Sequence, residues 1–280
     1  MKRIVTMQDL SCVGKCSLSV ALPIISSMGC ECCVLPTALL STHTAFKSFN
    51  IVDLTDNIGT VCDMWKREGI DFDMIYTGYL ASVEQVDQAF DLARDFSGEG
   101  KHLFVDPVMG DFGRLYTGFE ESYPAHMKRL CAKADIIVPN LTEAFCLLGE
   151  EYREDVSLEE AFDMAKRLTD IGTKSAVITG ICPEEGKLGI VKYDRIKDSF
   201  FSYFAPRVHT DFPLHGTGDV FASVAVGAVA SGMDIDKALS LAVDFTSKAV
   251  EKTAKNENRR WYGIDFESAL PLLWEMKSEK

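Results

Sequence analysis

The strongest constraint on the fold is a regular alternation of short apolar runs with longer amphipathic segments. This alternation predicts a mostly parallel sheet with helices on both faces, because each helix carries the chain back to begin the next parallel strand. Runs at 189–193 and 199–204 predict an antiparallel hairpin, whereas the hydroxyl-rich segment 36–50 has no periodicity that predicts an element. The predicted strands are 2–7, 32–35, 74–77, 102–105, 135–138 and 175–179, and the predicted helices are 18–28, 53–68, 83–96, 119–132, 158–169, 219–231 and 235–252, with further helices in PNLTEAFCLLGE and, a short one, at the end of the chain.

The 280 residues contain no linker, repeat or low-complexity stretch, so we predict a single α/β domain over 1–280. A net charge of −13 argues against nucleic acid or an anionic membrane surface as the main partner. No apolar run is long enough for a transmembrane helix, and the start of the chain turns polar too soon for a signal peptide. Nine cysteines without a disulfide rhythm favour a reducing cytoplasm.

Polar residues are concentrated in the loops that follow the predicted strands. Because open α/β sheets bind ligands at the carboxyl ends of their strands, these loops should meet at one edge of the sheet. They are rich in Asp, Asn, Thr, Gly and Tyr, and they read QDLS, PTALLSTHT, TGYL, DPVMGD, PNLTE, the pair Thr179–Gly180, and HGTGD.

The segment HGTGD opens a helix of small apolar residues. Gly216 and Gly218 flank Thr217, and a glycine turn at a helix N-terminus forms an anion site from unpaired N–H groups. Asp219 would be repelled by a bound phosphate, which favours a role as a base that faces the substrate. The alternative is an ordinary helix N-terminus capped by Thr217 or Asp219.

DPVMGD and PNLTE each follow a predicted strand directly. Asp106, Asn140 and Glu143 supply oxygen ligands of the kind that Mg²⁺ prefers, in part through waters. The alternatives are an ordinary first-turn acid for Glu143 and a turn residue for Asp106. An anion turn, two carboxylates and a base form the set that phosphoryl transfer from a metal-bound donor needs.

Other candidates carry less weight. GTGD matches neither the Rossmann nor the Walker pattern, and Cys32 and Cys33 should point to opposite faces of a strand, which disfavours a thiolate metal site. His43 either binds substrate or satisfies a loop carbonyl, and Tyr79 either stacks on a planar ring or fills the edge. His215 could be a turn residue without a role, and Lys15 and Lys187 are expected to be solvated.

These motifs resemble the ribokinase superfamily, and within it the pyridoxal, pyridoxine and pyridoxamine (vitamin B6) kinases. The resemblance covers nearly the whole chain and is carried by MQDLSCVGKCSLSVALP, LSTHTAF, TGYL, DPVMGD, VPNLTEAFCLL, a strand ending in VITG, and HGTGDVFAS. It implies a ribokinase-like three-layer α/β/α fold, a homodimer, and ATP-dependent phosphorylation of the 5′-hydroxymethyl group of a B6 vitamer. The product would be pyridoxal 5′-phosphate or a precursor in B6 salvage, and the implied cofactors are ATP and Mg²⁺, with a monovalent cation left open.

The resemblance also implies roles for individual residues. Asp219 would take the proton of the substrate hydroxyl, and the anion hole would consist of Gly216, Thr217 and Gly218. The substrate ring would be faced by His43, Thr44 and Tyr79, and Asp9 is a further candidate for substrate binding. The ATP phosphates would be held by Asp106, Asp111, Asn140, Thr179 and Gly180, the metal by Asp106 and Glu143, and DFGRLYTG would form a flap over ATP.

Asp9 departs from the family pattern, in which many pyridoxal kinases have serine. A carboxylate there could pair with a protonated pyridine nitrogen or an aminomethyl group, or reach a ring hydroxyl, which favours pyridoxamine or pyridoxine over pyridoxal. Hydroxymethylpyrimidine kinases of thiamine biosynthesis share the architecture, so a pyrimidine alcohol is the competing substrate. A non-catalytic metabolite-binding protein is the alternative of another class, and the intact GTGD and DPVMGD loops count against it. The THT and TGY segments fit a flat ring better than a sugar.

Overall fold

The computed structural model describes residues 1–96, 98 and 100–279. A nine-stranded sheet with the order β11-β10-β9-β8-β5-β4-β1-β2-β3 runs through the molecule, and β6 and β7 form a separate two-stranded sheet. From β9 to β2 all neighbours are parallel, whereas β10, β11 and β3 are antiparallel to theirs. The strands are β1 (Arg3–Ser11), β2 (Glu31–Leu40), β3 (Ile51–Asp53), β4 (Met74–Thr77), β5 (His102–Val105), β6 (Gly110–Asp111), β7 (Arg114–Leu115), β8 (Ile136–Ile137), β9 (Ser175–Ile181), β10 (Lys187–Asp194) and β11 (Ser199–Pro206).

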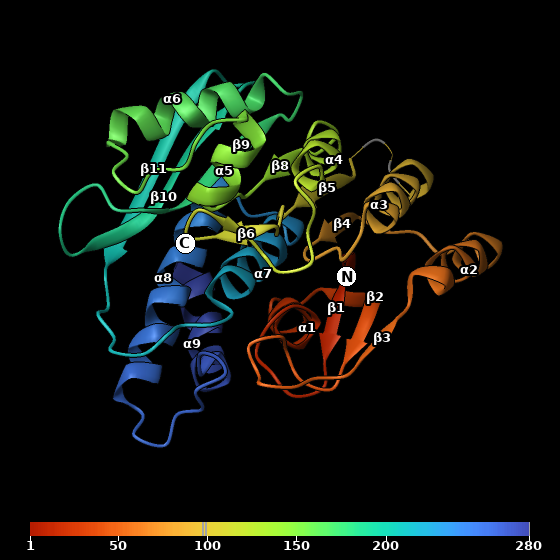
Figure 1. Ribbon diagram of the computed structural model, residues 1–280, viewed down its shortest axis with the longest axis horizontal. Helices are drawn as coiled ribbons and strands as arrows, with labels where there is room; N and C mark the ends of the chain where they lie inside the picture. Colours follow the sequence, from red (N-terminus) through yellow and green to blue (C-terminus); the bar gives the residue numbers. More distant parts are fainter. Residues whose placement is uncertain (97, 99, 280) are drawn as a thin grey trace.

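Helices cover both faces of this sheet. One buried apolar cluster joins the sheet to α1, α7, α8 and α9, and a second joins its other face to the helices α2 to α6. Figure 1 shows α7, α8 and α9 gathered in shades of blue, with α2 and α3 at the opposite, orange end of the molecule. The helices are α1 (Leu18–Ser27), α2 (Thr55–Arg67), α3 (Val83–Phe96), α4 (Tyr123–Cys131), α5 (Leu141–Leu148), α6 (Leu158–Thr169), α7 (Thr217–Ala230), α8 (Ile235–Lys255) and α9 (Phe266–Glu279).

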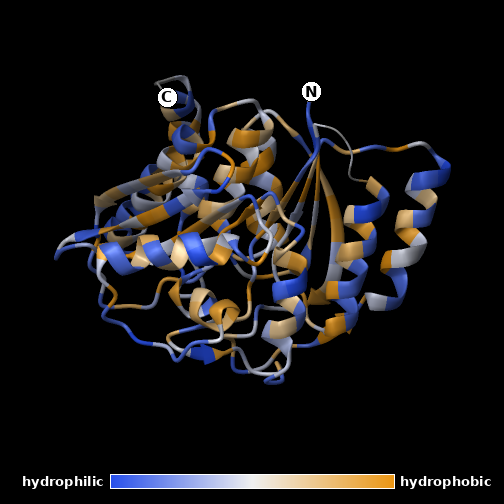
Figure 2. Ribbon diagram, turned by 90° about the horizontal axis from the view of Figure 1, so that it is seen from above, coloured by the Kyte–Doolittle hydropathy of each residue, from blue (hydrophilic) through white to orange (hydrophobic). Residues whose placement is uncertain are grey.

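The central strands are apolar on both faces because both faces are covered. Ile4 and Tyr76 belong to one cluster, and their neighbours Val5 and Ile75 belong to the other. In Figure 2 the strands form an orange core, and the flanking helices show mixed blue and orange surfaces. The predicted three-layer α/β/α fold is confirmed.

Most predicted elements are present with small shifts at their ends. The helices 83–96 and 158–169 and the strands 74–77 and 102–105 have the predicted bounds, and the hairpin is confirmed as β10 and β11 at one edge of the sheet. Cys32 packs against one apolar cluster and Cys33 against the other, as predicted for neighbours in a strand. All nine cysteines are free thiols.

Three segments differ from the prediction. In 36–50, β2 continues to Leu40, and β3 then pairs with it as an antiparallel edge strand. All three residues of β3 are exposed, so the alternation that marks a half-buried strand is absent. The helix predicted at 119–132 begins only at Tyr123, because a turn precedes Pro124 in its first helical turn. The closing helix α9 is also longer than expected, with 14 residues.

Within the part of the chain that the structure describes, no helix is both long and apolar enough to cross a membrane.

Candidate active site

Four side chains from separate strands and one helix converge at the carboxyl edge of the parallel strands. Asp9 lies near the end of β1, Tyr79 follows β4, Asp106 follows β5, and Asp219 lies in the first turn of α7. Burial raises the pKa values of Tyr79, Asp106 and Asp219; the charge of Asp9 adds to the rise for Tyr79 and Asp219, and the charge of Asp219 adds to that for Asp106. Such mutual effects require proximity, so these four side chains lie close together, as predicted for the loops that carry them.

The glycine turn before α7 has the geometry of an anion site. Gly216 has a φ of 82°, and a Cβ there would lie 2.0 Å from the Lys15 carbonyl oxygen, so only glycine fits. The helix begins at Thr217, two residues earlier than predicted, and no side chain caps it. The capped-helix alternative is therefore wrong. Within the described residues the N–H groups of Thr217 and Gly218 have no hydrogen-bond partner, which leaves two donors free for an anion.

Asp219 has the properties of a base that works near neutral pH. Its side chain is only partly exposed, and burial raises its pKa to about 7. The backbone N–H of Ser17 donates to its carboxylate and partly offsets this rise, whereas the charge of Asp9 adds to it. A carboxylate with this pKa accepts a proton more readily than an exposed one.

Asp9 is a buried carboxylate that no lysine or arginine of the described residues pairs with, although His43 lies close enough to lower its pKa in part. It is 5% exposed, and its Oδ1 accepts a hydrogen bond of 2.6 Å from the Ser17 hydroxyl. Burial raises its pKa, and this bond lowers it in part. Among the residues that the structure describes, no lysine or arginine forms an ion pair with it. A buried charge without a partner is unfavourable, so the site is electrostatically suited to a cationic ligand.

Asp106 and Glu143 form a second pair of buried carboxylates. Asp106 is 7% exposed and Glu143 is 3% exposed. The pKa of Asp106 is raised by burial and then by the charges of Glu143 and Asp219, and burial raises the pKa of Glu143 to about 8. Two like charges in such a place fit a divalent cation. Within the described residues no group of three or more His, Cys, Asp or Glu side chains could hold a metal ion, so waters and ligand oxygens would have to complete the shell.

Glu143 and Asn140 also form a capping box at the start of α5. The Glu143 carboxylate accepts from the N–H of Asn140 at 2.8 Å and of Met109 at 3.1 Å, and Asn140 accepts from the Glu143 N–H. Asn140 Nδ2 donates to the Gly110 carbonyl at 2.8 Å. Both side chains therefore connect the DPVMGD loop to the helix. Glu143 thus caps the first turn of α5 and also lies beside Asp106.

The remaining residues predicted to meet ATP lie around this box. Thr179 forms a β-bridge with Asn140, and its N–H donates to the Pro139 carbonyl at 2.9 Å. Gly180 is exposed with a φ of 79°, and a Cβ there would meet open space. Asp111 lies in the β6–β7 hairpin, within the predicted flap, and burial raises its pKa. The structure thus gathers the predicted phosphate-binding residues around one loop junction.

His43 serves a structural role. Its Nδ1 accepts from the Ala45 N–H at 3.2 Å, so Nε2 carries the proton and donates to the Tyr262 carbonyl at 2.9 Å. The loop-carbonyl alternative is therefore the one that this structure shows. Thr44 is exposed beside it. The ring of His43 lies 5.6 Å from that of His215 and packs among Phe46, Trp261 and Tyr262.

Comparison with known proteins assigns the chain to a family. The family model for phosphomethylpyrimidine kinase matches residues 22–262. The chain belongs to the phosphomethylpyrimidine kinase family. Pyridoxal kinase from Lactobacillus plantarum is 32% identical with a TM-score of 0.89, covering 100% of this chain and 99% of that chain.

Two further similar proteins carry names that refer to a different substrate. A Bacteroides thetaiotaomicron protein named after phosphomethylpyrimidine kinase, in a crystal form with pyridoxal, is 38% identical with a TM-score of 0.91, covering 97% of this chain and 95% of that chain. Hydroxymethylpyrimidine/phosphomethylpyrimidine kinase of Helicobacter pylori is 32% identical over 149 residues, which are 52% of this chain and 54% of that protein. This chain is thus similar both to a kinase named for pyridoxal and to kinases named for a pyrimidine.

Sequence reasoning missed several residues of this kinase. Lys15 is not solvated as expected, because its Nζ lies 2.7 Å from Asp265 and 2.9 Å from Glu267 and its side chain is 13% exposed. Ser17 contacts both Asp9 and Asp219. Lys187 is exposed as predicted and pairs with Glu184. Nothing local in the sequence marks the long-range partners of Lys15 and Ser17.

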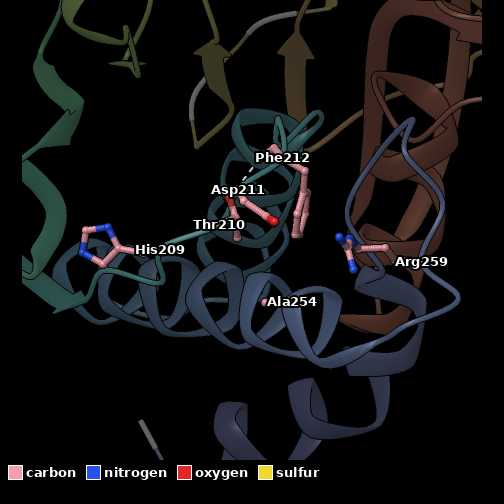
Figure 3. A pocket seen from close by; sticks show the side chains of 6 residues that line it. All are labelled: His209, Thr210, Asp211, Phe212, Ala254 and Arg259. Carbon is pink, nitrogen blue, oxygen red and sulfur yellow. Dashed lines mark hydrogen bonds between the residues drawn. The ribbon is translucent and has the colours of Figure 1, made fainter.

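An open cavity of about 600 Å³ lies beside the anion turn of the kinase. It is formed by the residues that precede the turn, by α8, and by the connector between α8 and α9 (256–265), and Figure 3 shows the Arg259 guanidinium directed toward the Phe212 ring. The guanidinium carbon is 3.9 Å from the ring centre, a cation–π distance. The lining residues are His209, Thr210, Asp211, Phe212, Ala254 and Arg259.

Proposed function

We propose that this protein is an ATP-dependent kinase that phosphorylates the hydroxymethyl group of a B6 vitamer. The observation that carries the proposal is the juxtaposition of Asp219, with a pKa of about 7, with the unpaired N–H groups of Thr217 and Gly218. A base for a hydroxyl and an anion turn for a phosphoryl group are the two devices that this transfer requires.

In the proposed reaction the substrate hydroxyl oxygen attacks the γ-phosphorus of ATP, and its proton passes to a carboxylate oxygen of Asp219. The bond between the γ-phosphorus and the β,γ-bridging oxygen breaks, which leaves ADP. The N–H groups of Thr217 and Gly218 stabilise the charge on the transferring group. Asp106 and Glu143 would hold Mg²⁺ through waters, and its chemistry is neutralisation of the donor phosphates.

The donor nucleoside is proposed to lie in the cavity beside the anion turn. Its volume of about 600 Å³ is in the range of small-molecule sites. Arg259 and Phe212 offer a cation and an aromatic face for a flat base.

Asp9 supports a B6 vitamer over a neutral ring. It is buried, has no lysine or arginine partner among the described residues, and lies close enough to Tyr79 to add to the rise of that phenol's pKa. A protonated pyridine nitrogen or an aminomethyl group would compensate its charge. The second candidate is phosphorylation of a hydroxymethylpyrimidine, which the name of the family model favours.

The test is an ADP-release screen with pyridoxal, pyridoxine, pyridoxamine, hydroxymethylpyrimidine and ribose, with an ATP-only control for each preparation. We expect the highest kcat/KM for a B6 vitamer. A higher value for hydroxymethylpyrimidine would select the second candidate. No ADP release with any alcohol, from protein that binds ATP, would support a non-catalytic metabolite-binding role.

A further inference from the structure

Ser17 has a backbone conformation that serine rarely adopts. Its φ is 49° and its ψ is −131°, whereas residues other than glycine avoid positive φ. Such strain persists only where the surrounding structure enforces it, and it is concentrated at functional sites. Ser17 is buried, at 6% exposure, immediately before α1.

The side chain of Ser17 is not used for the task that its position offers. Serine is a favoured N-cap residue because its hydroxyl can accept from the first turn of the helix, but here it makes no cap hydrogen bond. Its hydroxyl instead donates to Asp9 at 2.6 Å. Its backbone N–H lies close enough to the Asp219 carboxylate to lower the pKa of that group in part. Ser17 thus lies beside two carboxylates that repel each other, and it donates its hydroxyl to one of them.

The neighbouring residues hold Ser17 in this conformation. The Lys15 carbonyl packs against Gly216, and the Lys15 ammonium group is held by Asp265. The hydroxyl of Ser19 lies 3.1 Å from the Gly14 carbonyl oxygen and 2.7 Å from that of Cys16. The loop is therefore fixed at both ends and within its own turn, which leaves Ser17 little freedom to relax.

We propose that Ser17 is a positioning residue that sets the place of the substrate-recognising carboxylate Asp9 relative to the base Asp219. Through its hydroxyl it orients Asp9 toward the cationic group of the substrate ring. This inference rests on the proposed function and adds a determinant of which ring alcohol is aligned with the base.

The test measures KM and kcat for pyridoxamine and pyridoxine in variants that lack the Ser17 hydroxyl. Ser17→Ala removes only the hydroxyl, so KM for pyridoxamine should rise about 10-fold, the range of a hydrogen bond to a charged group, while kcat changes by less than about threefold. Ser26→Ala is the control, because this serine is exposed near the end of α1. It should leave the ratio of the two KM values unchanged.

A double-mutant cycle shows whether Ser17 acts through Asp9. In the Asp9→Asn background, Ser17→Ala should change KM by less than about twofold, because the charged acceptor is already gone. Equal effects of Ser17→Ala in both backgrounds, or an effect equal to that of Ser26→Ala, would overturn the proposal. The cycle uses whichever ring alcohol the wild-type protein phosphorylates, so a failed screen of substrates refutes the function and a failed cycle refutes the role of Ser17.

The strain has its own measurement. Ser17→Gly also lacks the hydroxyl but tolerates a φ of 49°. Glycine is ordinarily favoured over alanine at an N-cap, which alone predicts a melting temperature about 2 °C higher for Ser17→Gly than for Ser17→Ala in a chain of this size. Relief of the strain should make this difference clearly larger. A difference of about 2 °C or less would mean that the backbone at this position is not strained in solution, and it would overturn this part of the proposal.

Discussion

Replacement of Asp219 by asparagine should lower turnover by about 10³-fold and yet stabilise the protein at alkaline pH. The pKa of this carboxyl rises from its ordinary 3.8 to about 7 in the folded protein, mainly by burial. At ~1.4 kcal/mol per pKa unit, ionisation in the folded state therefore opposes folding by about 4 kcal/mol at most. The side chain is partly exposed, and solvent screening reduces this to about 2 kcal/mol.

The sign of the pH dependence follows from proton binding. Because the folded-state pKa lies above the ordinary value, the folded protein binds more protons than the unfolded chain between about pH 4 and pH 7. Wild-type stability from this group therefore falls as the pH rises through that window, and Asp219→Asn removes the fall. At about 2 °C per kcal/mol for a chain of this size, the variant should melt ~4 °C higher than wild type at pH 8, and this gap should shrink toward pH 5.

The assay is thermal melting of both proteins without ligands at pH 5 and pH 8, together with steady-state ADP release. Asp155→Asn is the control, because this aspartate is exposed in a loop, and its melting difference should not depend on pH. Turnover of Asp219→Asn should fall by about 10³-fold, the range for loss of a general base, with ATP affinity nearly unchanged. A pH-independent melting gap would refute the argument from burial, and turnover within tenfold of wild type would refute the assignment of the base.

Further predictions concern the same edge of the sheet. Wild-type kcat should decline as the pH falls below about 7, because Asp219 becomes protonated; a flat profile from pH 5 to pH 8 at saturating substrate would contradict this. Glu143→Gln keeps a capping box but removes the charge, so the Mg²⁺ concentration for half-maximal rate should rise about 10-fold; an unchanged titration would remove Glu143 from the metal shell. Gly216→Ala should destabilise the fold by about 2 kcal/mol or more in urea unfolding, since its Cβ would meet the Lys15 carbonyl, whereas Gly218→Ala meets no atom within 4 Å and should not. Arg259→Ala should raise KM for ATP severalfold, because the adenine base would lose the cation that Arg259 offers it, and KM for the ring alcohol should not change. The reverse pattern would place the nucleoside elsewhere.

Local sequence patterns predicted the fold and the main motifs of the site. Helix 158–169 has the bounds that its period predicts, and the glycines of HGTGD mark a turn that the structure confirms at a φ of 82°. The edge strand β3 was not predicted, because all of its residues are exposed. Its position is set by pairing with β2, and local periodicity gives no sign of this pairing.

The site residues divide along the same line. Asp106, Glu143 and Asp219 each lie in a short motif directly after a strand or at the start of a helix, so topology alone brings them to one edge. His43 shows the opposite case, because its sequence left two roles open and the Tyr262 carbonyl, 219 positions away, accounts for its Nε2.

The sequence by itself therefore determined the parallel sheet, the glycine turn before α7 and the proposed base beside it, because periodicity and glycine conformation act over a few neighbouring residues. Only the tertiary structure decided how these groups are held. The Lys15 ammonium group pairs with Asp265, which lies 250 positions away in the sequence. Ser17 lies beside two carboxylates, those of Asp9 and Asp219, in a conformation that serine rarely adopts. Both arrangements depend on contacts between segments that meet only when the sheet has formed, so no local pattern could have recorded them.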